Sequence, residues 1–109
     1  MITAVVQFKL TDGTSLVDAT EIFQSTAPRY RGMKGLMRKY YLFDPETGKG
    51  GGCYLFENRA AAEEVFNDTW RQLVKDKYGA EPSILYFDTP VVVDNVSNEI
   101  VGGTKITTK

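Results

Sequence analysis

The stretch that decides the fold is residues 48–58, Gly-Lys-Gly-Gly-Gly-Cys-Tyr-Leu-Phe-Glu-Asn. Three interpretations compete for it: a glycine loop that cradles phosphate, the base-stacking strand of an RNA-recognition domain, or the third strand of a barrel that binds a small molecule. A phosphate loop needs glycines after a strand, then Lys and Ser or Thr opening a helix. Here Lys49 precedes the glycines and a strand-like run follows them, so we interpret the glycines as the flexible arm of a hairpin.

The residues on either side of the glycines complete this hairpin. Residues 44–48, Asp-Pro-Glu-Thr-Gly, predict its turn, because Pro45 fixes φ and Gly48 accepts a positive φ. A strand of about Leu36 to Asp44 comes before the turn, and a strand of about Gly52 to Glu57 follows it.

The rest of the chain supplies two helices and two further strands. Residues 2–10 alternate between apolar and mixed faces, which predicts a strand. Ser15 and Asp18 have the spacing of a capping box, so we expect a helix from there to about Pro28. After the N-cap Asn58, one long helix to Gly79 is predicted from an apolar face made of Ala62, Val65, Phe66, Thr69, Trp70, Leu73 and Val74. A fourth strand is expected at 83–88.

This βαββαβ order predicts a ferredoxin-like α+β sandwich, in which an antiparallel sheet carries both helices on one face. The 109 residues suffice for one domain, which we place at residues 1–95. Residues 96–109 are expected to form a tail that is mobile or contacts a second subunit, with the threonine-rich end 104–109 mobile.

Composition restricts the partners and the chemistry. With 13 basic and 14 acidic residues the net charge is −1, which gives no general attraction to nucleic acid or anionic membranes. The first residues resemble neither a signal peptide nor a membrane span, so a cytoplasmic location is predicted. The chain has no histidine, which excludes Ser/His and Cys/His catalysis and histidine-ligated zinc or haem. Cys53 is the only cysteine and is expected to be a packed strand residue.

An RNA-recognition domain has the same element order, and its third strand carries the aromatic rings that stack on bases. When that motif is aligned on Lys49-Gly50, the two positions that should carry base-stacking rings fall on Gly51 and Cys53. Neither side chain can stack on a base. The sequence therefore argues against nucleic acid as a partner.

The third interpretation is a family resemblance. Residues 29–41, Arg-Tyr-Arg-Gly-Met-Lys-Gly-Leu-Met-Arg-Lys-Tyr-Tyr, together with residues 51–57 and 60–62 and with Phe66, resemble the YdhR-like monooxygenases. That family is similar to the antibiotic-biosynthesis monooxygenases of the dimeric α+β barrel superfamily. The resemblance covers roughly residues 2–95 and is most specific at residues 35–39 and 51–56.

The resemblance implies a homodimer whose two sheets face each other, with a pocket between helices and sheet in each subunit. It also implies oxidation of a small phenolic or polycyclic aromatic substrate by dioxygen, with no metal, haem or flavin cofactor. In related cofactor-free oxygenases the deprotonated substrate reduces oxygen directly, while the protein binds the anion and excludes water. The alternative is a homodimer of the same fold that binds a small molecule, or acts structurally, without catalysis.

Lys39 and Trp70 are the candidate catalytic residues. A buried lysine has a lowered pKa, so it could accept a phenolic proton and stabilise the anion; an exposed salt bridge is the alternative. Trp70 could lean over an aromatic ligand, or could serve only in core packing. Strand alternation means that only one residue of the pair Arg38/Lys39, and one of Tyr40/Tyr41, faces a given pocket. The candidate substrate-binding residues are Arg38, Tyr40, Tyr41, Tyr54 and Tyr86.

Overall fold

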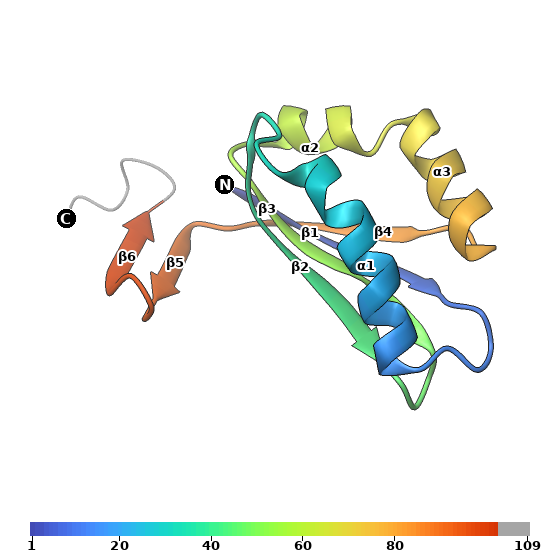
Figure 1. The fold of residues 1–109 in the computed structure, drawn as a ribbon. Helices are drawn as coiled ribbons and strands as arrows, with labels where there is room; N and C mark the ends of the chain where they lie inside the picture. The colour runs from blue at the N-terminus through green and yellow to red at the C-terminus, as the bar shows by residue number, and fades with distance from the viewer. Residues whose placement is uncertain (103–109) are drawn as a thin grey trace.

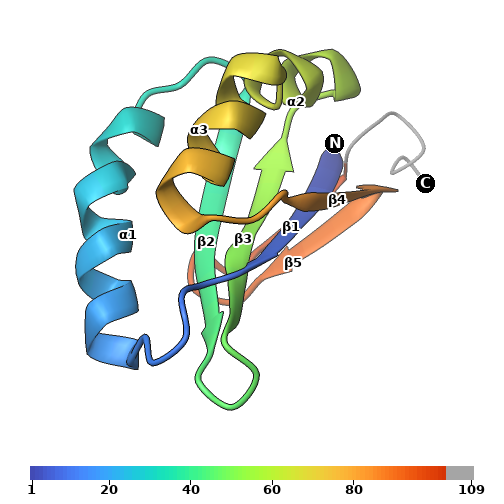
Figure 2. The ribbon, with the colours of Figure 1, turned by 90° about the vertical axis from the view of Figure 1, so that its right-hand side faces the viewer.

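The computed structural model describes residues 1–102, so the predicted mobile end at 104–109 lies outside the described residues. In chain order the elements are β1 (Ile2–Lys9), α1 (Leu16–Tyr30), β2 (Leu36–Asp44), β3 (Lys49–Phe56), α2 (Arg59–Val65), α3 (Asp68–Tyr78), β4 (Ser83–Asp88), β5 (Val91–Asp94) and β6 (Glu99–Gly102). Strands β1 to β4 form an antiparallel sheet in the order β2-β3-β1-β4. The helices lie on one face of that sheet (Figures 1 and 2). The predicted ferredoxin-like α+β fold is confirmed.

Helix α1 begins where the capping box predicts. The Ser15 hydroxyl accepts the Asp18 backbone N–H at 3.0 Å, and the Asp18 carboxylate accepts the Ser15 N–H at 3.2 Å. The helix ends at Tyr30, two residues after Pro28, in agreement with the limit expected from that proline. Ala19 and Phe23 are its buried contacts with the sheet.

The glycines belong to the strand itself, which corrects the prediction of a flexible arm before a strand starting near Gly52. Strand β3 begins at Lys49, and Gly50, Gly51 and Gly52 are all buried and paired with β1 and β2. Gly51 has φ +149°, and a Cβ atom there would lie 1.9 Å from the Val6 carbonyl oxygen. The glycines are therefore required by close packing between strands.

The predicted long second helix is two helices, which corrects its continuity. It breaks at Phe66, where the backbone leaves helical geometry, and Asn67 starts α3 by accepting the Trp70 N–H at 2.9 Å. The Asn67 side chain also donates to the Glu64 carbonyl oxygen at 3.0 Å. Asparagine side chains compete with helical backbone hydrogen bonds in this way and interrupt a helix. The apolar residues keep their 3.6-residue spacing across the break, so this spacing alone predicts one continuous helix. The predicted Gly79 C-cap is present, with φ +77°.

The core lies between the helices and the sheet and is rich in aromatic rings. Tyr54 and Phe56 of β3 stack at 5.9 Å, and Phe66 meets both rings edge to face at 5.0 and 5.6 Å. Phe66 in turn contacts Trp70, with ring centroids 4.6 Å apart. Such edge-to-face and offset pairs add to the stabilisation from burial alone.

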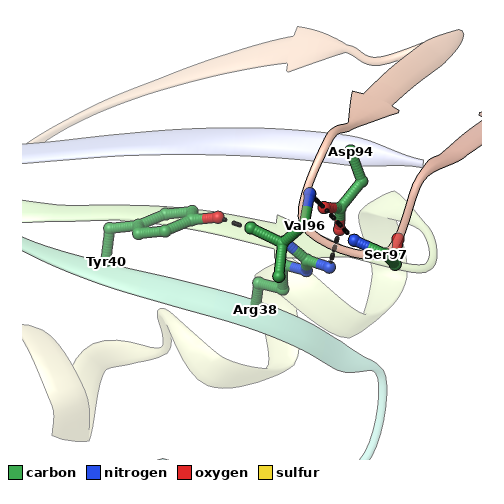
Figure 3. A network of polar contacts seen from close by, with 5 residues as sticks. All are labelled: Arg38, Tyr40, Asp94, Val96 and Ser97. Carbon is green, nitrogen blue, oxygen red and sulfur yellow. Dashed lines mark hydrogen bonds and ion pairs between the residues drawn. The ribbon is translucent and has the colours of Figure 1, made fainter.

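The opposite face of the sheet, which we call the open face, has no helix on it within residues 1–102. Four large side chains there are between 41% and 57% exposed: Tyr40, Leu42, Leu85 and Phe87. Strands β5 and β6 form a separate hairpin that projects beyond the sheet (Figure 1). An ion pair between Arg38 of β2 and Asp94 of β5 connects the hairpin to the open face (Figure 3).

Asp94 is the one buried charged residue among those described, and it is held by more than its ion pair. Its carboxylate also accepts the backbone N–H groups of Val96 at 2.9 Å and Ser97 at 3.1 Å, in the turn of the hairpin. These two bonds and the Arg38 guanidinium lower the pKa of Asp94 from its ordinary value.

Residues 1–102 contain no helix long and apolar enough to cross a membrane.

Candidate functional site

A cavity lies between α1, α3 and the sheet. Its volume is about 90 Å³. The sheet supplies the floor and the two helices supply the walls, side by side in Figure 2. The lining residues are Phe8, Phe23, Thr26, Arg29, Tyr30, Lys39, Tyr41, Gly51, Tyr54, Trp70, Leu73, Val74, Lys77 and Tyr78. Most of them are apolar or aromatic, which is the lining typical of small-molecule pockets.

The Lys39 ammonium group lies among three aromatic rings. Its Nζ atom is 3.4 Å from the ring centroid of Tyr30, 3.7 Å from that of Tyr41 and 4.7 Å from that of Tyr54. Burial lowers the pKa of Lys39 from its ordinary 10.5 to about 7, because the charged form loses hydration. The ring faces attract the cation and oppose this effect. Lys39 can therefore exchange a proton near neutral pH.

Glycine at position 52 makes room for this arrangement. A Cβ atom there would lie 2.9 Å from the Tyr54 ring and 3.4 Å from Cε of Lys39. With no side chain at Gly52, the lysine stem and the Tyr54 ring occupy the space above the strand. The glycine run thus shapes the site as well as the sheet.

Three tyrosine hydroxyls of the cavity, those of Tyr41, Tyr54 and Tyr78, remain protonated at neutral pH. Burial raises the pKa of Tyr54 and Tyr41 above the ordinary 10.0, and raises that of Tyr78 to about 12. The hydroxyl of Tyr41 shares a hydrogen bond with the Thr26 hydroxyl at 2.7 Å. The hydroxyl of Tyr30 accepts the indole N–H of Trp70 at 2.9 Å.

Four of the seven predicted site residues come together in the cavity: Lys39, Tyr41, Tyr54 and Trp70. The strand alternation predicted for the pairs Arg38/Lys39 and Tyr40/Tyr41 is present. Arg38 and Tyr40 lie on the open face, where Arg38 pairs with Asp94. They are therefore not lining residues of this cavity.

Tyr86 is also outside the cavity, although it shares the helix-side face with Tyr54. Its ring lies 6.4 Å from Phe66, and the Arg59 guanidinium of α2 stacks over it at 4.0 Å. Both tyrosines pair with Ala4 in the middle strand, but on opposite sides of it. The separation across β1 keeps Tyr86 away from Lys39.

Sequence reasoning missed three residues that matter to the site: Tyr30, Lys77 and Tyr78. Tyr78 follows Trp70 and Val74 at intervals of four residues, the spacing of one helix face. Tyr30 follows Phe23 at an interval of seven, which also returns to one helix face. These spacings were available in the sequence, and they extend the apolar faces to the last turns of both helices.

Metal ligands are not grouped in the described part of the chain: within residues 1–102 no three Asp, Glu or Cys side chains come together in a possible metal site.

Comparison with solved structures finds the same ferredoxin-like α+β fold in proteins described as antibiotic biosynthesis monooxygenases. A putative antibiotic biosynthesis monooxygenase from Deinococcus radiodurans superimposes with a TM-score of 0.65 at 10% identity, covering 86% of this chain and 97% of that one. A protein of unknown function from Nitrosomonas europaea gives 0.62 at 15% identity, with coverages of 81% and 87%. A putative antibiotic biosynthesis monooxygenase from Bordetella bronchiseptica gives 0.60 at 14% identity, with coverages of 81% and 95%.

Residues 5–87 match the family described as "Putative mono-oxygenase ydhR", and the chain belongs to this family. The resemblance inferred from residues 29–41 and 51–57 is confirmed. No match was found among curated proteins. At identities of 10% to 15% the solved structures establish the fold alone.

Proposed function

We propose that the cavity binds a single-ring phenol as its anion and that the protein oxidises this ligand with dioxygen, without a bound cofactor. The observation that carries the proposal is the Lys39 amine, which faces the cavity among three aromatic rings and titrates near neutral pH. Membership of a mono-oxygenase family supports the reaction type.

The volume favours one ring over several. A cavity of roughly 150 Å³ holds a benzene molecule, whereas the enclosed space here is about 90 Å³. A single ring can enter if its outer edge stays at the mouth or if a helix moves slightly. A polycyclic substrate requires α1 and α3 to separate.

In the proposed reaction Lys39 takes the phenolic proton. An ordinary phenol has a pKa of about 10, so giving its proton to an amine of pKa about 7 costs about 4 kcal/mol. The ion pair formed inside the aromatic cavity has to offset this cost. The site therefore favours phenols that are more acidic than phenol itself.

The oxidation balances without another reagent. The phenolate transfers one electron to dioxygen, and the phenoxyl radical and superoxide combine to form a C–O bond at a ring carbon bearing hydrogen. The Lys39 ammonium returns its proton to the resulting peroxide. Loss of the ring proton and cleavage of the O–O bond then release water and leave a quinone, so that the phenol and dioxygen give a quinone and water.

The test is oxygen uptake by metal-free protein with a series of phenols and anthrone-like compounds, in ¹⁸O₂. We expect uptake above the buffer rate, one labelled oxygen atom in the product, and loss of both in Lys39→Met. Lys49→Met, an exposed change on β3, serves as the matched control and should retain activity. Uptake equal to buffer for every compound would remove the oxygenase proposal.

Binding without oxidation is the second candidate function. It is favoured by the small volume of the cavity, which leaves little space for dioxygen beside a ring. Saturable quenching of Trp70 fluorescence by phenols, with no oxygen uptake, would support it over the first.

We also propose that the functional unit is a homodimer joined through the open face. The exposed Tyr40, Leu42, Leu85 and Phe87 form an apolar surface of the kind that protein partners cover. The homodimer implied by the family resemblance uses this same face of the sheet.

A further inference from the structure

The charged side chains that line the cavity all have the same sign. Arg29, Lys39 and Lys77 contribute to the lining, and no Asp or Glu among the described residues does so. The chain as a whole has 14 acidic and 13 basic residues. The positive charge is therefore a property of this site and does not follow from the composition.

The described residues supply no negative partner to these three cations. The ion pairs within residues 1–102 join other residues: Lys9 with Asp12, Arg38 with Asp94, Arg59 with Glu63, and Lys75 with Glu81. Tyr41, Tyr54 and Tyr78 do not provide a phenolate at neutral pH, because burial raises their pKa values above the ordinary 10.0. Unpaired basic side chains in a cavity favour an anionic ligand, and Lys39 contributes to this in its protonated form.

The three cations occupy two depths. Lys39 is partly buried and lies over the rings, whereas Arg29 and Lys77 are exposed at the rim. Arg29 is in the last turn of α1. Lys77 is on α3, one turn after Leu73, so the side chains of Lys77 and Leu73 lie on the same face of that helix. The mouth therefore has a cation on each of its two helical walls.

Two carboxylates near the mouth do not belong to this cavity. Asp68 and Asp76 border an adjoining surface hollow, which is also bordered by Arg29. Asp76 accepts a hydrogen bond from the Gln72 side chain at 2.8 Å. Neither Asp68 nor Asp76 is among the residues that line the cavity itself.

We propose that the ligand is an aromatic carboxylate, whose ring enters between α1 and α3 and whose carboxylate stays at the mouth within reach of Arg29 and Lys77. This assignment rests on the proposed function, because it takes the ligand to be a phenol whose hydroxyl group faces Lys39. The enclosed space of about 90 Å³ is smaller than the roughly 150 Å³ that holds a benzene ring, so a substituent on the ring remains at the mouth. A carboxylate at the mouth keeps part of its hydration and avoids the cost of full burial. Arginine also matches the planar geometry of a carboxylate.

The test compares 3-hydroxybenzoate with 3-hydroxybenzamide, which has nearly the same shape and no charge, by calorimetric titration at pH 7. We expect the acid to bind about tenfold more tightly, since charge-assisted hydrogen bonds are stronger than neutral ones. The indole N–H signal of Trp70, the only tryptophan, should shift on titration with either compound. Raising the salt concentration should reduce the preference for the acid.

Arg29→Gln and Lys77→Gln should each reduce the acid-to-amide ratio at least threefold and leave amide binding nearly unchanged. Lys75→Gln is the matched control, because it removes the same charge from α3 at an exposed position outside the cavity lining. It should leave the ratio unchanged. Equal binding of acid and amide, or an unchanged ratio in both rim variants, would overturn the assignment.

The binding experiment and the oxygen-uptake experiment can give different results, so each proposal can fail without the other. A preference for the acid without oxygen uptake supports the ligand class and counts against oxidation. Oxygen uptake with acid and amide at equal affinity supports oxidation and counts against the ligand class.

Discussion

The indole nitrogen of Trp70 donates a hydrogen bond to the hydroxyl oxygen of Tyr30 at 2.9 Å, and this bond ties α3 to α1 beside the cavity. Tyr30 also presents its ring to Lys39, with Nζ 3.4 Å from the centroid. The bond therefore links the two helices at one point and helps to position one ring of the lysine cage. Trp70 is buried, so its N–H depends on this acceptor for satisfaction.

Tyr30→Phe keeps the ring and removes the acceptor. The buried N–H of Trp70 loses its partner, and we expect unfolding free energy to fall by about 1 to 2 kcal/mol. Urea titration measures this loss, and the indole N–H resonance should move upfield. Tyr86→Phe is the control, because the Tyr86 hydroxyl has no hydrogen bond within residues 1–102. Equal losses in the two variants would show that the Trp70–Tyr30 bond contributes nothing specific.

Lys39 makes stability depend on pH. Its folded pKa of about 7 lies below the ordinary 10.5 of the unfolded chain. Between these values the unfolded state binds the extra proton, so stability rises with pH, by up to about 1.4 kcal/mol per unit. Urea titrations from pH 7 to 9.5 should show this rise in wild type and a flat profile in Lys39→Met. A parallel rise in both proteins would contradict the assignment to Lys39.

Above pH 10 the tyrosines should reverse the trend. Burial raises the folded pKa of Tyr41, Tyr54 and Tyr78 above 10.0, so the unfolded chain releases their protons first. The stability that they contribute is complete below pH 10 and is lost as the pH rises through their folded pKa values. Absorbance at the phenolate wavelength should report their late ionisation in folded protein.

Gly51→Ala should be among the most damaging single changes. Its Cβ would lie 1.9 Å from the Val6 carbonyl oxygen at φ +149°, and we expect a loss of more than about 3 kcal/mol. Gly13→Ala is the matched control, because Gly13 also has a positive φ but no heavy atom lies within 4 Å of the added Cβ. It should cost only about 1 kcal/mol. Similar melting temperatures for both variants would refute the close approach of β3 to β1.

Asp94→Asn should loosen the β5–β6 hairpin and leave the main sheet intact. The change removes the charge that pairs with Arg38 and weakens the acceptor for Val96 and Ser97. Amide hydrogen exchange in residues 91–102 should accelerate several-fold, while β1 and β3 stay protected. Asp88→Asn, an exposed change at the end of β4, is the control. Unchanged exchange in the hairpin would mean that the ion pair does not hold it.

Leu85→Glu should prevent association through the open face. It places a charge on the edge strand β4 within the proposed apolar contact, where it would be desolvated without a partner. Sedimentation velocity at micromolar concentration should show a dimer in wild type and a monomer in the variant. Leu16→Glu makes the same change at a similarly exposed position on α1 and should leave the dimer intact. A monomeric wild-type protein would end the homodimer proposal.

Period-two and helical patterns predicted most of the fold. The alternation of residues 2–10 identified β1, and Ser15 with Asp18 located the start of α1 to the residue. The break at Phe66 was not predictable from periodicity, because the apolar positions continue in phase from Ala62 to Val74. Asn67 was its local signal, since its side chain caps a new helix start in the middle of the pattern.

The site was predictable on the sheet and less so on the helices. Strand alternation predicts that Lys39 and Tyr41 share one face of the sheet. It does not predict which face, because that depends on the side on which the helices pack. Tyr86 shares that face with Tyr54 and is nevertheless outside the cavity, because strand order determines lateral position. The Trp70–Tyr30 hydrogen bond joins residues 40 positions apart in the sequence. The residue pattern of a single helix or strand cannot predict a contact between two different elements.

The separate N-cap at Asn67 determines how the cavity can change its size. Helix α3 is an 11-residue rod with its own start at Asn67 and its own left-handed stop at Gly79. A rod that ends at both sides in capped junctions can swing by rotating a few junction torsions, with every helical hydrogen bond kept. Had residues 59–78 formed one continuous helix, the same widening would have required bending or unwinding it. The wall that carries Trp70 and Lys77 thus has at each end a junction that can pivot, while the floor beneath it is formed by the paired strands β1, β2 and β3.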